Sequence, residues 1–355
     1  MKKLGNRAYV LLALTVVLFI APDAIADEKP ILRVMFGSCC RENRPQPIWE
    51  SIVAAEPEMF LFIGDNIYGD SRDVNVLKAK YETLFANEGF TKLRETCPLL
   101  ATWDDHDYGE NDAGVEYPIK AQSQKLFNDV YGVVEDSPRR KRPGIYDSQI
   151  IGPEGKRLQI ILLDTRYFRD KLRSWPRGER PQGRGPYRPH EGDENTILGE
   201  AQWAWLEGEL KKPAEVRIIA SSIQVIPYQH GWESWGNFPS ERKRLFEIIA
   251  KTKAGGVLFI SGDRHHGELS RIEPADSGVG YALFDATSSS LNQPSGGGNR
   301  GEPNRYRLGE NFPQINFGQI SIDWDKEDPV VTVAIKGGDG KELKAQNIDL
   351  SDLQP

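Results

Sequence analysis

The stretch MFLFIGDNIYGD at residues 59–70 decides the fold, because five apolar residues lead directly into a turn that carries carboxylates and a tyrosine. A continuous apolar run of this length is typical of a strand that is buried on both faces, as in a parallel sheet. Gly64 and Asp65 suit the tight turn that ends such a strand. The sequence therefore predicts a central strand over residues 59–63 with polar side chains at its C-terminal end.

Apolar runs of similar length recur along the chain and alternate with stretches of helical character. The runs are 31–37, 99–103, 158–163, 216–220 and 257–260, and the helical stretches are 47–55, 73–86, 119–130, 198–210 and 241–251. This alternation favours right-handed crossover units around a mainly parallel central sheet. Three later runs, 281–284, 317–324 and 330–335, have no helices between them and predict antiparallel strands. We therefore expect a second sheet packed on the first.

The first 26 residues have the order of a secretory signal peptide. Lys2, Lys3 and Arg7 are followed by the apolar run 8–20 and by Ala24-Ile25-Ala26, a small-x-small cleavage signal. The alternative is an uncleaved membrane anchor, but the apolar run is short for a bilayer span. We expect cleavage after Ala26, a single domain over 27–355, and a periplasmic or secreted protein without a stable membrane anchor.

The charge of the chain restricts its partners. The sequence has 45 basic and 52 acidic residues, a formal net charge of −7. Nucleic-acid binding through a basic face is therefore not expected. A small phosphate ester remains a possible substrate, because metal cations reverse the local field of an acidic site.

The three cysteines are Cys39, Cys40 and Cys97. The predicted strands place Cys97 roughly 15–20 Å from the other two, at about 3.3 Å per strand residue, so an intramolecular disulfide is not expected. A free thiol in an exported protein needs another use, and metal ligation is one.

Five polar clusters follow predicted strands. They are Gly37-Ser38-Cys39-Cys40-Arg41, Gly64-Asp65-Asn66-Ile67-Tyr68-Gly69-Asp70, Trp103-Asp104-Asp105-His106-Asp107, Asp164-Thr165-Arg166 and Ser261-Gly262-Asp263-Arg264-His265-His266. Ligands of open α/β sheets bind at the carboxyl ends of the strands. Each cluster alone could be a turn or an exposed loop. Carboxylates brought together from several strands repel each other, so the full set indicates a metal site.

The ordered motifs Gly-Ser-Cys, Gly-Asp-x-x-Tyr, Trp-Asp-Asp-His-Asp, Leu-Asp-Thr-Arg and Ser-Gly-Asp-Arg-His resemble those of the PhoD-like (alkaline phosphatase D) family of the metallophosphoesterase superfamily. The resemblance runs from about Arg33 to Leu269. It implies an α/β fold, a two-sheet metallophosphoesterase-like sandwich with flanking helices, whose site lies on the strand ends.

The resemblance also implies a centre of ferric iron and calcium. Carried over by position, Asp65 bridges the metals, while Cys39 as thiolate and Tyr68 as phenolate bind iron. Asp263 completes the iron shell. Anionic thiolate, phenolate and carboxylate donors favour a trivalent ion, whereas carboxylate and carbonyl oxygens favour calcium.

The remaining roles come from the third and fifth motifs. Asp105 is the expected ligand of the second metal, and His265 binds metal directly or through water. His106 is expected near the leaving oxygen, as proton donor and substrate contact. His266 matches no motif position and is expected behind these ligands. Other metallophosphoesterases have a ligand histidine where this chain has Ser221-Ser222-Ile223-Gln224, which leaves the second metal's ligand set incomplete.

Three arginines, Arg41, Arg166 and Arg264, are candidates for binding phosphate oxygens, since a guanidinium pairs with them in a bidentate manner. A structural salt bridge is the alternative for each. Two long loops, 170–196 and 288–311, are candidate covers of the substrate site.

The predicted function is hydrolysis of phosphate monoesters or diesters by attack of a metal-bound hydroxide, with Asp65, His106 and Arg264 as catalytic residues. One alternative is a glycoside hydrolase with paired carboxylates and sugar-binding tryptophans. Its candidate tryptophans are Trp203, Trp205, Trp232 and Trp235. Another alternative is a non-enzymatic calcium-dependent binding module, which has no use for a thiolate or a phenolate.

Overall fold

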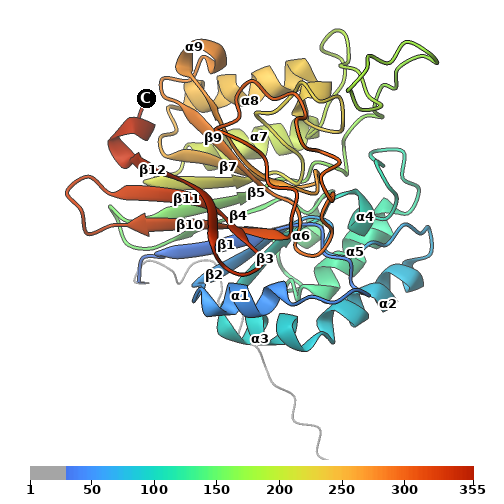
Figure 1. Ribbon diagram of the computed structural model, residues 1–355, viewed down its shortest axis with the longest axis horizontal. Helices are drawn as coiled ribbons and strands as arrows, with labels where there is room; N and C mark the ends of the chain where they lie inside the picture. Colours follow the sequence, from blue (N-terminus) through green and yellow to red (C-terminus); the bar gives the residue numbers. More distant parts are fainter. Residues whose placement is uncertain (1–28) are drawn as a thin grey trace, which may run out of the picture.

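Two six-stranded sheets lie face to face in the computed structural model, which describes residues 29–355 (Figure 1). The predicted signal peptide, residues 1–26, lies outside the described residues. Within residues 29–355, none of the helices has the length and apolar character needed to cross a membrane.

The first sheet has the strand order β12-β11-β10-β1-β2-β3. Its parallel half consists of β1 (Arg33–Gly37), β2 (Met59–Ile63) and β3 (Leu99–Thr102). Its antiparallel half is formed by β10 (Asn316–Asp323), β11 (Val330–Gly337) and β12 (Glu342–Asp349). The N-terminal and C-terminal parts of the chain therefore share one sheet.

The second sheet has the order β4-β5-β6-β7-β9-β8. Four neighbouring strands run parallel: β5 (Leu158–Leu162), β6 (Val216–Ala220), β7 (Val257–Ser261) and β9 (Leu283–Ser288). The two edge strands are β4 (Asp147–Ile151), which is antiparallel to β5, and β8 (Gly267–Ile272), which is antiparallel to β9.

Helices cover the outer faces of both sheets (Figure 1). The first sheet packs on α1 (Ile48–Ala54), α2 (Val74–Phe85), α3 (Glu88–Thr96) and α5 (Lys120–Val130), and the second on α7 (Gly199–Leu210) and α8 (Pro239–Thr252). Shorter helices are α4 (Asp105–Tyr108), α6 (Pro138–Lys141), α9 (Pro274–Ser277) and the 3-10 turns η1 (Trp235–Asn237) and η2 (Leu350–Leu353).

The residues of β2 show why its sequence is apolar throughout. Met59, Leu61 and Ile63 belong to the core that contains the second sheet, whereas Phe60 and Phe62 point to the opposite side and pack under the helices. Phe62 meets Trp49 and Phe90 at ring-centroid distances of 5.9 Å each. Successive side chains of a strand alternate between its faces, so a strand with two covered faces has no position for a polar residue.

The predicted α/β fold with two sheets and flanking helices is confirmed, but the predicted distribution of strands is wrong. The six predicted parallel strands do not form one sheet, because β1, β2 and β3 belong to the first sheet and β5, β6 and β7 to the second. The strand expected at 281–284 begins at Leu283. It is antiparallel to the unpredicted edge strand β8, as expected, but it pairs in parallel with its other neighbour, β7.

All three cysteines are free, as expected, and all three are buried. Cys40 and Cys97 belong to the core under the helices, and Cys39 follows β1 at the edge of the sheet. A structural role as apolar residues accounts for the first two but not for Cys39.

The close approach of β10 to β1 generates a stability prediction. Gly318 lies opposite Phe36, and a Cβ at residue 318 would lie 2.0 Å from the Phe36 ring. We expect Gly318→Ala to lower the free energy of unfolding by roughly 1–3 kcal/mol, because the added methyl group overpacks the core. The measurement is urea denaturation followed by circular dichroism.

The matched control is Gly208→Ala in α7, where no atom lies within 4 Å of the added Cβ. It should leave the protein as stable as before or more stable by up to about 1 kcal/mol. Equal effects of the two substitutions would contradict the packing of β10 on β1.

Candidate metal centre

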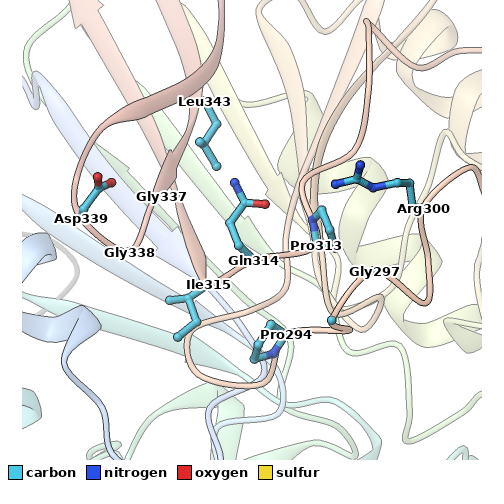
Figure 2. Close-up of a pocket in the computed structure, with 11 residues that line it drawn as sticks. Pro294, Gly297, Arg300, Pro313, Gln314, Ile315, Gly337, Gly338, Asp339 and Leu343 are labelled. Carbon is cyan, nitrogen blue, oxygen red and sulfur yellow. The ribbon is translucent and has the colours of Figure 1, made fainter.

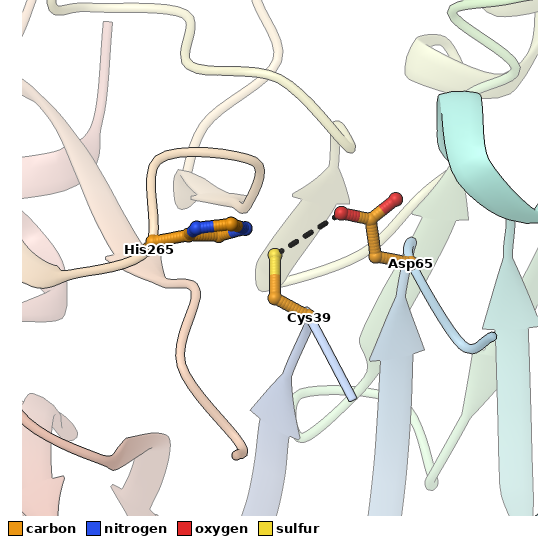
Figure 3. Close-up of side chains that lie close together, drawn as sticks. All are labelled: Cys39, Asp65 and His265. Atoms are coloured by element: carbon orange, nitrogen blue, oxygen red, sulfur yellow. Dashed lines mark hydrogen bonds between the residues drawn. The ribbon is translucent and has the colours of Figure 1, made fainter. Parts of the chain in front are cut away.

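The carboxyl ends of the parallel strands of both sheets meet at one edge of the molecule. Cys39 follows β1, Asp65 follows β2 and His265 follows β7, and Figure 3 shows their side chains directed toward one another. One ligand atom from each lies within 4.8 Å of the others. The structure thus brings together residues that are up to 226 positions apart in the sequence, as the strand-end argument predicted.

The backbone at these positions is strained. Cys39, Asp65, Asp263 and His265 have φ angles of 60°, 50°, 68° and 54°, in the left-handed region that residues with a side chain rarely adopt. At Cys39 and Asp65 this conformation is held by a hydrogen bond between the segments that follow β1 and β2. In this bond Cys40 N donates to Asp65 O at 2.9 Å. Strained residues of this kind cluster at functional sites. Here the strain turns each side chain toward the common centre.

Four potential ligands surround a first cation position. The Sγ atom of Cys39 lies 3.3 Å from Asp65 Oδ2, and the hydroxyl of Tyr68 lies 3.0 Å from His265 Nε2. The other oxygen of Asp65, Oδ1, is buried without a hydrogen-bond partner in the described structure. A buried carboxylate oxygen without a donor is an available ligand.

A second position is lined by carboxylates. Asp104, Asp105 and Asp263 offer oxygen atoms within 4.8 Å of one another. Asp104 was part of a quoted motif but was not predicted as a ligand. Its Oδ1 accepts a hydrogen bond from Ser222 Oγ at 2.6 Å, while its Oδ2 is buried without a partner. Asp263, expected beside iron, thus groups with the carboxylates of the second position.

The protonation equilibria of these groups fit a metal centre. Burial raises the pKa of Cys39 to about 12 and that of Asp104 to about 7. Burial is also the main cause that raises the pKa values of Asp65, Tyr68 and Asp263. A cation among the groups would stabilise their anionic forms and reverse this effect. The donor set of thiol, phenol and carboxyl groups therefore suits a highly charged ion.

His106 differs from the other site residues because its charged form is stabilised. Burial alone would lower the pKa of His106, but nearby carboxylates, first those of Asp105 and Asp65, raise it to about 11. Its Nδ1 lies 2.7 Å from Asp70 Oδ1, and its ring lies against that of Tyr68 with centroids 4.2 Å apart. The contact with Asp70 fixes the orientation of the imidazole, and the surrounding carboxylates favour its protonated form. Asp70 was missed, although it stands in the quoted Gly64–Asp70 motif.

Two of the three predicted phosphate-binding arginines lie at the centre. The Arg41 guanidinium stacks 4.2 Å above the ring of Tyr68. Arg264 is 7% exposed, pairs with Glu302 and lies 4.8 Å from the ring of Trp232. Both belong to the edge where the candidate ligands converge.

The structure corrects the predicted role of Arg166. Its side chain is fully buried, and its guanidinium donates to Asp104 Oδ1 and, at 2.7 Å, to Glu233 Oε2. Arg169 adds a second contact to Glu233 at 2.9 Å. Because its donors are held by carboxylates in the interior, Arg166 orients a candidate ligand and does not face the substrate.

The segment that replaces the missing ligand histidine contributes only neutral groups. Ser222 reaches Asp104, as described above, whereas Gln224 Nε2 donates to Glu268 Oε1 at 2.7 Å, away from the candidate ligands. His266 is fully buried with its Nε2 3.5 Å from the same Glu268. It belongs to none of the clusters that could hold a metal among the described residues.

Loop 288–311 lies against the candidate centre. Asn292 N donates to Cys39 O at 3.4 Å, and Ser295 N donates to His265 O at 3.0 Å. A groove of about 920 Å³ lies between this loop and the β11–β12 turn (Figure 2). It is lined by residues including Pro294, Arg300, Ile315 and Leu343, and none of the candidate ligands borders it. The groove is therefore separate from the candidate metal positions.

Loop 170–196 is tied to the centre by side chains. Tyr187 OH donates to Asp112 Oδ2, and Asp112 N donates to Asp105 Oδ2 at 2.6 Å. Asp112 and Glu233 form a further acidic group with Asp105. Neither residue was predicted as a ligand.

Comparisons with known proteins agree with this arrangement. The family model described as PhoD-like phosphatase matches residues 35–328. Alkaline phosphatase D of Bacillus subtilis (strain 168) is 25% identical over 220 residues, which are 56% of this chain and 36% of that protein. The chain thus spans about a third of the length of this curated relative.

Two solved structures share the fold. The structure of PhoD matches with a TM-score of 0.68 at 16% identity, over 92% of this chain and 70% of that one. GAP50, the anchor in the inner membrane complex of Plasmodium, matches with a TM-score of 0.55 at 15% identity, over 90% of this chain and 89% of that one.

The buried position of Arg166 generates a prediction that separates its two possible roles. Arg166→Met should lower the free energy of unfolding by roughly 3–5 kcal/mol, because the buried carboxylate of Asp104 loses its arginine and that of Glu233 keeps only Arg169. Urea denaturation measures the loss. The control Arg72→Met removes an exposed ion pair with Glu110 and should change stability by less than about 1 kcal/mol. Wild-type stability of Arg166→Met with only a raised KM would restore the role in substrate binding.

Proposed function

The chain belongs to the PhoD-like phosphatase family, and we propose that it is a secreted, metal-dependent phosphoesterase that hydrolyses phosphate monoesters or diesters. The observation that carries this proposal is the convergence of Cys39, Asp65, Tyr68 and His265 with a second set of carboxylates at the strand ends. Buried acidic groups in such number require cations. Secretion is proposed from the leader 1–26, outside the described residues.

We assign the residues to the ferric iron and calcium that the family resemblance implies, and the chemistry of the donors supports this assignment. Cys39, Tyr68 and Asp65 supply anionic donors to iron, whereas Asp263 groups with Asp104 and Asp105. Asp104 and Asp105 supply oxygen donors to calcium, which accepts carboxylates in flexible geometry. His265 contacts Tyr68 and belongs to the iron side of the site.

When bound, the metal ions would polarise the phosphoryl oxygens and increase the acidity of a water molecule. Residues of the chain itself orient the phosphate and protonate the leaving group. The guanidinium groups of Arg41 and Arg264 orient the phosphate. Protonated His106 donates from Nε2 to the departing oxygen, because its Nδ1 is held by Asp70. Arg166 donates a hydrogen bond to Asp104 Oδ1 and so holds the carboxylate of Asp104 in position.

The two alternatives gain little support from the described residues. A glycoside hydrolase needs accessible aromatic surfaces that bind sugar. However, Trp203 of α7 is buried in the hydrophobic core, and Trp235 is fully buried. Trp205 is half-buried with its ring 4.7 Å from that of Tyr146, and Trp232 is 41% exposed. A calcium-dependent binding module has no use for the thiol of Cys39 beside Asp65.

The assignment of Cys39 and Asp65 predicts linked losses of metal and activity. Cys39→Ser and Asp65→Ala should each lower bound iron and reduce kcat for p-nitrophenyl phosphate at least about a hundredfold, because charge stabilisation at phosphorus is lost. Elemental analysis of the purified variants, together with the hydrolysis rate, measures both effects.

Cys97→Ser is the matched control, because Cys97 is also buried but lies at the end of α3, in the core under the helices. It should retain metal and activity. Full metal content and full activity in Asp65→Ala would disprove the proposed centre.

His106 should act on the leaving group and not on metal content. His106→Gln is expected to reduce kcat by about 10²–10⁴ for alkyl phosphates, which need a proton donor. The reduction should be smaller for p-nitrophenyl phosphate, whose leaving group departs without a proton. Steady-state rates over a series of leaving-group pKa values test this. A uniform loss across the series, or loss of metal, would instead indicate that His106 is a ligand.

A further inference from the structure

A basic surface segment stands next to the candidate centre of this acidic protein. Residues 171–190, which we call the arginine arm, contain six basic residues and one acidic residue, Glu179, in a chain of net charge −7. The basic residues are Lys171, Arg173, Arg177, Arg180, Arg184 and Arg188. The arm belongs to the yellow-green loops that project from the molecule in Figure 1. Asp170, Glu191, Asp193 and Glu194 flank the arm, so the excess of positive charge is confined to residues 171–188, where it attracts anions.

Several arginines of the arm are available for a ligand. Arg173 pairs with Glu191 at 2.8 Å, whereas Arg177, Arg180 and Arg184 have no carboxylate partner within residues 29–355. Arg177 and Arg180 are exposed, and Arg184 is half-buried. Structural salt bridges therefore do not account for these three guanidinium groups.

The arm is held in a fixed place by backbone hydrogen bonds to residues 230 and 231. Gly185 N donates to His230 O at 2.7 Å, and Tyr187 N donates to Gly231 O at 2.8 Å. Tyr187 OH also donates to Asp112, whose backbone N–H binds Asp105. The base of the arm is thus joined through Asp112 to Asp105, a candidate metal ligand.

Arg184 stands at the point of attachment. A Cβ placed on Gly231 would lie 3.4 Å from the Cβ of Arg184. The next residue, Trp232, is 41% exposed and stacks on Arg264 beside Asp263. Arg184 therefore lies at the attached end of the arm, and Arg180 and Arg177 are exposed on the same segment.

We propose that the arginine arm is an anion subsite that binds a further phosphate group of the substrate, beyond the ester that is cleaved. Guanidinium groups pair with phosphate oxygens in a bidentate manner, which suits this class of ligand. The inference rests on the proposed function, because it concerns the substrate of the same site. The inference specifies a substrate with at least two phosphate groups. The motifs around the candidate metal positions do not distinguish such a substrate from one with a single phosphate group.

The test uses two substrates that differ by one phosphate: thymidine 5′-(p-nitrophenyl phosphate), without and with a 3′-phosphate. The wild type should show a higher kcat/KM for the second substrate by roughly tenfold, from about three exposed charge pairs. Arg177→Gln/Arg180→Gln/Arg184→Gln should abolish this preference and leave kcat/KM for the first substrate unchanged. Arg184→Lys should retain only part of it, because the charge remains but the bidentate pairing is lost.

The matched control is Lys211→Gln/Lys251→Gln/Lys326→Gln, which removes the same charge from exposed positions outside the arm. It should keep the preference of the wild type. Raising the salt concentration to about 0.5 M should weaken the preference in the wild type, because exposed charges are screened. A preference that survives in the arm variant, or disappears in the control, overturns the inference.

Binding measurements separate this inference from the proposed function. Isothermal titration calorimetry with thymidine 5′-phosphate and thymidine 3′,5′-bisphosphate reports affinity without turnover. If the wild type cleaved neither ester but bound the bisphosphate more tightly through the arm, the proposed function would fail and the subsite would stand. Equal affinities of the wild type for both ligands would overturn the subsite alone.

Discussion

The buried ion pair between Arg166 and Asp104 is the interaction on which the geometry of the candidate centre depends. Asp104 follows β3 in the first sheet and Arg166 follows β5 in the second, so the pair joins the two sheets at their functional edge. Trp103 Nε1 reinforces the junction by donating to Asp164 Oδ1 at 2.9 Å. This connection helps to fix the separation of the strand ends, so that candidate ligands from both sheets can converge.

The sequence predicted the parts of the fold that depend on local pattern. Strands such as 59–63 are apolar throughout because both faces are covered, and this leaves a clear signal. The assignment of strands to sheets failed because pairing depends on partners distant in the chain. The edge strand β12, ELKAQNID, was missed because most of its side chains are exposed or half-exposed and it lacks an apolar run.

The same distinction applies to the candidate centre. Cys39, Asp65 and His265 were predicted to converge because each follows a strand, and strand ends meet. Asp112 and Glu233 were not predicted, because only the folded chain brings them to Asp105. Arg166 was given the wrong role, since a motif shows that an arginine is near a site but not which anion it faces. Burial and the positions of Asp104 and Glu233 decide that question.

The left-handed backbone at Cys39, Asp65, Asp263 and His265 has a consequence for the evolution of this protein. Glycine adopts this conformation without strain, and asparagine tolerates it better than most residues. Mutational drift toward these residues would relax the backbone while removing the candidate ligands. Thermodynamic stability and the proposed metal binding therefore favour different residues at the same four positions, and selection for the proposed activity would maintain the strained backbone.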